Sequence, residues 1–151
     1  MERRHAVLAV RPDFAEALVE GRKQVEFRRV RPSLSPGDAV YVYATAPVKA
    51  VVGAFVCGPI VEGRPDALWQ EFAKASGVPK PFFTSYFRGS KRGCAIKVVQ
   101  PRAWPSPLVL RQIRQHLPNF SPPQSYMFLD ETEPLFSLLT GYSQNGARLD
   151  R

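Results

Sequence analysis

Residues 39–63 read AVYVYATAPVKAVVGAFVCGPIVEG, and this stretch decides the fold. The β-branched and aromatic residues from Ala39 to Ala44 predict a strand, and the apolar run after the "TAP" break predicts a second, longer one. Neither face of the first strand is charged, because Tyr41 and Tyr43 alternate with valines. A sheet with two apolar faces must be covered on both, so the pattern predicts a closed or well-covered sheet, such as a small barrel packed by helices.

Strands and helices are mixed along the rest of the chain. Further strands are expected at 5–10, 24–29, 94–99 and 125–129, and helices within 12–21, 64–77, 79–89 and 105–118. There is no repeated strand–helix–strand unit and no long linker, so we expect an α+β domain over residues 1–130, a mixed β-barrel of about five or six strands flanked by helices. Residues 131–151 are expected to form a short helix and a polar tail, either disordered or packed as an appendage.

The charge of the chain favours a polyanionic partner. Lys and Arg total 21 against 13 Asp and Glu, a net charge of +8. Nucleic acid is the first candidate and an acidic membrane surface the second, with solubility alone as the alternative explanation. The sequence leaves the oligomeric state open.

The cysteines and histidines do not have the spacings of a metal site. Cys57 and Cys94 each lie in an apolar run, and neither His5 nor His116 has a neighbouring ligand, so no metal and no cofactor is expected. Two buried reduced thiols, together with the lack of a signal-peptide pattern or a run of transmembrane length, predict a cytoplasmic protein that does not bind membranes.

The charged stretch GRKQVEFRR, residues 21–29, holds the first candidate site. As a strand, it places Val25 and Phe27 on one face and Glu26 and Arg28 on the other. A solvated edge strand, whose cations block aggregation, is one explanation. The other is a polar groove in which one ligand touches both charged side chains.

The chemistry expected of such a groove follows from its charges. Glu26 would accept from a base amino group, while Lys23, Arg28 and Arg29 hold phosphates. The turn after the preceding helix is expected to expose Lys23. Neighbouring arginines would lower its pKa, as a catalytic lysine requires.

A second candidate site lies where the strand 39–44 ends. Tyr43, Thr45 and Lys49 cluster in and beside the following loop, and loops at strand ends are frequent ligand sites. A plain turn around Pro47 explains the same pattern. Tyr43 would either stack on a base or fill the core.

Two further polar stretches have competing explanations. RGSKRG, residues 88–93, suits either backbone phosphates or a surface loop, and it lacks the spacing of a nucleotide triphosphate loop. Gln124 and Ser125, at a strand start after two prolines, would hydrogen-bond a base edge or close the loop.

Three segments together resemble a known family. LAVRPDFAEALVEGRKQVEFRR (8–29), SPGDAVYVYATAPVKAVVGAF (35–55) and PPQSYMFL (122–129) are similar, in this order, to the small prokaryotic ASCH proteins of the PUA-like superfamily. The resemblance covers about residues 6–129, with Ala46 where the family often has serine. It implies a PUA-like β-barrel with flanking helices and a cleft lined by the GxKxxExR segment.

The resemblance also implies a link to RNA. ASCH domains are proposed to bind RNA. One group of members removes the acetyl group of N4-acetylcytidine with a Lys, a Thr and a Glu, and another member cleaves RNA. Lys23 matches the catalytic lysine of this group, but Glu26 stands where the group has its threonine. The catalytic glutamate is expected around Ala75 and Ser76, and the nearest glutamate in this sequence is Glu71.

Two hypotheses follow from these departures. In the favoured one, the protein is a binding module that holds single-stranded nucleic acid, RNA above all, or a modified nucleobase or nucleoside in a basic cleft. In the alternative, it is a metal-independent hydrolase that uses Lys23 and Glu26, either as a ribonuclease or as an amidohydrolase of N4-acylated cytidine.

Overall fold

The structure, a computed structural model, describes residues 3–149 as a mixed sheet with helices around it. The strands are β1 (His5–Val10), β2 (Val25–Arg28), β3 (Ala39–Ala44), β4 (Ala50–Gly63), β5 (Gly93–Val109) and β6 (Tyr126–Leu129). The helices are α1 (Pro12–Val19), α2 (Pro65–Ser76), α3 (Lys80–Tyr86), α4 (Leu110–His116) and α5 (Pro134–Leu149). The predicted α+β class and a sheet of six strands are confirmed.

The strand order of the sheet is β2-β5-β4-β3-β1-β6. β1 and β3 run parallel, and the other neighbours run antiparallel. Within residues 3–149, the strand pairings leave β2 and β6 as edges, so the sheet is well covered rather than closed by hydrogen bonds.

β5 differs most from the expectation. It continues far beyond the predicted 94–99 and replaces the first turn of the helix expected in 105–118. The strand can continue because its pairing with β4 shifts register at several points. Such shifts accommodate residues like Pro101, which has no N–H to donate to the neighbouring strand.

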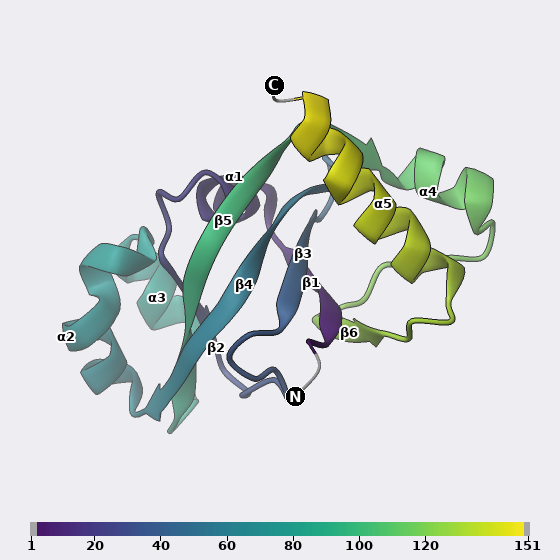
Figure 1. Ribbon diagram of the computed structural model, residues 1–151. Helices are drawn as coiled ribbons and strands as arrows, with labels where there is room; N and C mark the ends of the chain where they lie inside the picture. The colour runs from purple at the N-terminus through teal and green to yellow at the C-terminus, as the bar shows by residue number, and fades with distance from the viewer. Residues whose placement is uncertain (1–2, 150–151) are drawn as a thin grey trace.

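Apolar side chains cover both faces of the sheet, as its sequence requires. One cluster contains Leu8, Val42 and Leu18 of α1, and another places Tyr41 beneath Leu139 of α5. A third cluster joins β2 and β5 to α2 and α3. Figure 1 shows α2 and α3 together at one side of the sheet, with α4 and α5 at the other.

The C-terminal segment shares this core. The sequence predicts a short helix and a polar tail over residues 131–151, either disordered or packed as an appendage. In the structure α5 has 16 residues, and Leu135 and Leu139 are buried against the sheet. Residues 150–151 lie outside the described part of the chain.

A candidate active site beside strand β2

β2 is an edge strand, but its charges are not solvated. Among residues 3–149 it pairs with β5 alone, as the edge-strand interpretation predicts. However, Glu26 is only 6% exposed and Lys23, just before the strand, only 1%. The polar face of GRKQVEFRR therefore points into the protein, where each charge needs a partner.

Lys23 is held by the end of α2, far away in the sequence. The N–H of Gln24 donates to the carbonyl of Ala75 at 2.8 Å, which fixes the segment before β2 against this helix. Gly77, with a φ of 64°, ends the helix in the left-handed conformation that glycine tolerates best. The ammonium of Lys23 donates to the carbonyl of Ser76 at 2.8 Å, at the negative end of the helix dipole.

The expectation that Lys23 is exposed is wrong, because the turn before β2 directs its side chain inward. Burial is also the main reason that the pKa of Lys23 is lowered, although its pairing with Glu26 opposes the shift. Of the arginines expected to contribute, Arg28 does so, as a smaller cause. Arg22 instead forms an ion pair with Glu20 at 2.9 Å.

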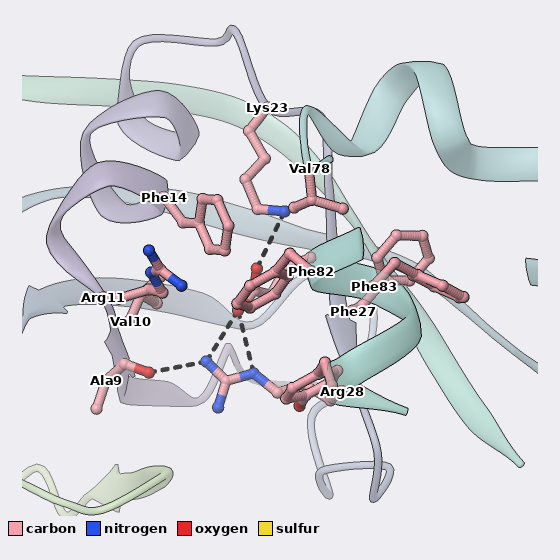
Figure 2. A pocket seen from close by; sticks show the side chains of 12 residues that line it. Ala9, Val10, Arg11, Phe14, Lys23, Phe27, Arg28, Val78, Phe82 and Phe83 are labelled. Carbon is pink, nitrogen blue, oxygen red and sulfur yellow. Dashed lines mark hydrogen bonds and ion pairs between the residues drawn. The ribbon is translucent and has the colours of Figure 1, made fainter. Parts of the chain in front are cut away.

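Glu26 lies between two cations. One carboxylate oxygen is 3.4 Å from the Lys23 ammonium, and the other is 3.0 Å from Nη2 of Arg28. Nη2 of Arg28 also donates to the carbonyl of Ala9 at 2.8 Å (Figure 2). Its Nη1 donates to Oγ of Ser125 at 3.4 Å. The arginine thus bridges β2 to β1 and the start of β6. We call Lys23, Glu26 and Arg28 the charged floor; its formal charge is +1.

A pocket of about 160 Å³ opens above the charged floor. Its walls are mainly apolar and aromatic, formed by Val10, Phe14, Phe27, Val78, Phe82, Phe83 and Tyr86. The guanidinium carbon of Arg11 lies 4.7 Å from the ring centre of Phe14 and 4.9 Å from that of Phe82 (Figure 2). A cavity of about 150 Å³ holds benzene, so this pocket has room for a single ring of a ligand.

Two of the other predicted site residues lie near this pocket. Ser125 is at its edge, in contact with Arg28, and the neighbouring Gln124 is exposed to solvent. Arg29 is just outside, with its guanidinium carbon 5.0 Å from the ring centre of Tyr86, a residue of the pocket wall.

The second candidate site is not part of the pocket. Tyr43 is buried in the cluster that contains Ile113 of α4, and burial raises its pKa. Thr45 and Lys49 belong to the turn after β3, and Lys49 lines a separate hollow with Arg114. None of these three residues lines the pocket, although the backbone N–H of Thr45 donates to the carbonyl of Val10, a pocket residue, at 2.9 Å.

Several residues of the pocket are not predicted from the sequence. Arg11 directly follows a predicted strand, a position that often carries ligand contacts, and could have been found on that ground. Phe82 and Tyr86 are four residues apart on one helical face, but this spacing suggests core packing equally well. The Ser76 carbonyl has no signal in the sequence, because only the tertiary fold brings it to Lys23.

Two observations bear on the chemistry that this site can carry out. Within residues 3–149, no group of three or more His, Cys, Asp or Glu residues is placed to hold a metal ion. Glu71 is exposed and does not line the pocket, so Glu26 is the single carboxylate among the described lining residues.

One further feature bears on membranes. None of the helices in the described part of the chain is both long and apolar enough to span a bilayer.

The fold and the pocket define a helix-flanked mixed sheet with an ion-paired cleft at its edge strand. The family model of the ASCH domain matches residues 8–104. A protein from Zymomonas mobilis named "ASCH domain-containing ribonuclease" is 34% identical over 139 residues, which cover 91% of this chain and 93% of that protein. The chain belongs to the ASCH domain family.

Solved structures agree with this assignment. The crystal structure of ASCH from Zymomonas mobilis matches with a TM-score of 0.84 and 32% sequence identity, covering 92% of this chain and 96% of that one. A protein from Pseudomonas putida, 18% identical, matches with a TM-score of 0.57 over 92% of this chain and 99% of its own, and shows the fold alone.

Proposed function

We propose that this protein is a metal-independent ribonuclease, with its catalytic centre at the charged floor. The observation that carries the proposal is the geometry of Glu26, a carboxylate held between two cations at the bottom of an open pocket that fits one ring. The relative named a ribonuclease supports the choice of RNA, since it matches nearly the whole chain.

The pocket has the size and polarity for one ring of a nucleotide in a single strand. A ribose ring fills the space above the charged floor, and its base then lies outside against aromatic side chains at the rim, where stacking is worth about 1–3 kcal/mol per base. The +1 charge of the floor attracts the adjacent phosphate, whereas Arg11 at the wall adds little net charge because it is paired with Asp13 at 2.9 Å.

Cleavage then needs a base for the 2′-hydroxyl group. Glu26 accepts the proton, the 2′-oxygen forms a bond to phosphorus, and the bond from phosphorus to the 5′-oxygen breaks, giving a 2′,3′-cyclic phosphate and, after protonation, a 5′-hydroxyl. The guanidinium of Arg28 stabilises the negative charge that grows on the phosphate oxygens.

Lys23 has a different part in this reaction. Its ammonium is only 1% exposed and donates to Ser76, so it does not reach a substrate. We assign it as a positioning residue, which holds the carboxylate of Glu26 in place through their ion pair at 3.4 Å.

The test compares RNA with DNA of the same sequence in the presence of a chelator. We expect cleavage of single-stranded RNA with cyclic phosphate ends and no cleavage of DNA, which lacks the 2′-hydroxyl group. Glu26→Gln should reduce the rate by about 100-fold or more, the usual contribution of a general base. Glu62→Gln, which changes an exposed ion pair, is the matched control and should leave the rate unchanged.

The other outcomes separate the remaining hypotheses. Binding of RNA without turnover would identify a binding module instead of an enzyme. Turnover of N4-acetylcytidine but not of RNA would identify an amidohydrolase. Cleavage that is unchanged in Glu26→Gln would remove the charged floor as the catalytic centre.

A further inference from the structure

A group of basic residues lies next to the pocket, outside the site described above. They are Arg29, at the end of β2, and Arg88, Lys91 and Arg92, in the turn between α3 and β5. We call these residues the basic strip. All are exposed to solvent.

The sheet register brings the two parts of the strip together. Arg28 pairs with Cys94, so Arg29 continues β2 alongside Gly93. The packing is tight: a Cβ atom on Gly93 would collide with the ring of Phe87 and lie 3.2 Å from the carbonyl of Arg28. The turn that begins at Phe87 and the end of β2 are therefore packed against each other.

Tyr86 connects the strip to the pocket. Its ring is stacked on Phe82 in the pocket wall, with centres 5.9 Å apart and planes at 10°. Its hydroxyl group accepts from the backbone N–H of Arg29 at 3.2 Å, and the guanidinium of Arg29 covers its ring. The surface thus runs from the aromatic wall directly to the first cation of the strip.

The cations of the strip are available to a ligand. The nearby Arg31 forms an ion pair with Glu62 at 2.9 Å, but no ion pair among residues 3–149 involves Arg29, Arg88, Lys91 or Arg92. Exposed guanidinium and ammonium groups without acidic partners suit phosphate oxygens, which arginine binds in a bidentate manner.

We infer that the basic strip binds the phosphate backbone of a single strand whose nucleotide occupies the pocket. This inference rests on the proposed function and sharpens it: the substrate is a polymer that extends past Tyr86, not a free nucleoside. The strip binds phosphates and therefore contributes affinity without sequence preference.

The experiment compares two triple variants that lose the same charge. Arg88→Gln/Lys91→Gln/Arg92→Gln changes the strip, and Lys74→Gln/Arg102→Gln/Arg111→Gln removes exposed cations of α2, β5 and α4. The binding probe is single-stranded DNA of about 12 nucleotides, within the usual site sizes of about 4–16. DNA presents the same phosphates but cannot be cleaved through a 2′-hydroxyl group.

The strip variant should bind the probe about tenfold or more weakly at about 50 mM salt. The slope of log affinity against log salt should fall by about 0.7 for each phosphate that the variant no longer neutralises. Its kcat/KM should fall for long RNA and stay unchanged for a dinucleotide. The control variant should change both quantities much less.

If the two triple variants weakened DNA binding and the cleavage of long RNA equally, net charge alone would explain both losses. That result would overturn the inference and leave the proposed function intact. A strip variant that lost activity on the dinucleotide as strongly as on long RNA would also overturn it. If the unmodified protein neither bound nor cleaved single strands, the proposed function itself would fail.

Discussion

The pocket beside β2 and the sheet face beneath α4 and α5 both combine aromatic rings with cations, but they bury different groups. In the pocket, the charges themselves are buried and paired, with Glu26 between two cations. Beneath the helices, Tyr43 and Trp104 are buried, while the neighbouring Arg114 stays exposed. The difference teaches that converging buried charges mark a candidate site more strongly than an aromatic strand does, since aromatic residues also serve as core.

The two regions also differ in whether all of their buried polar groups have hydrogen-bond partners. The charged groups of the pocket floor all have partners. In the part of the chain that the structure describes, the indole N–H of Trp104 is the one buried side-chain polar atom without a partner. An apolar face tolerates one such group at a cost of about 1–3 kcal/mol, whereas a floor of buried charges depends on complete pairing.

The largest expected effect comes from breaking the pairing of the floor. Glu26→Gln leaves the buried Lys23 and the partly buried Arg28 without their common counter-ion, and removing one partner of a buried ion pair typically costs about 3–5 kcal/mol. Urea unfolding measures this loss. Glu62→Gln breaks an exposed pair and should cost at most about 1 kcal/mol. Similar losses in the two variants would mean that the floor is more solvated than its burial indicates.

A smaller loss, without an effect on the pocket, is expected from the other region. Leu139→Ala removes a fully buried side chain of α5 and should cost about 2–5 kcal/mol. Because the helix-covered face is separate from the pocket, the affinity of the folded variant for single-stranded DNA should match that of the unmodified protein. Affinity that fell together with stability would show that the two regions are coupled. Leu138→Ala, at a partly buried neighbouring position, is the control and should cost less.

The sequence predicts the sheet better than it predicts the site. The two-sided apolar pattern of residues 39–63 requires a covered sheet whatever its neighbours are, and α1 and α2 begin at Pro12 and Pro65, within the predicted ranges. The burial of Lys23 depends instead on the Ser76 carbonyl, 53 positions away, which the segment before β2 meets only in the tertiary fold. The length of β5 is equally hidden, because register shifts in a long antiparallel pair leave no local pattern.

The smallest expected effect is a difference in how the two kinds of buried group respond to alkaline pH. Burial lowers the pKa of Lys23 from 10.5. Between the folded pKa and 10.5, the unfolded chain therefore binds more protons than the folded one, and the contribution of Lys23 to the free energy of unfolding rises with pH. Burial raises the pKa of Cys94 from 9.0 to about 11, so this thiol contributes stability below pH 9.0 that is lost as the pH rises through about 11.

Lys23→Met should therefore make the unfolding free energy fall more steeply with rising pH, and Cys94→Ala should make it fall less steeply. Urea unfolding over this pH range measures both slopes, with the exposed Lys74→Met as the control for lysine removal. If all slopes equalled that of the unmodified protein, burial would not control the titration of either group, and the contrast between the charged floor and the apolar core would lose its electrostatic basis.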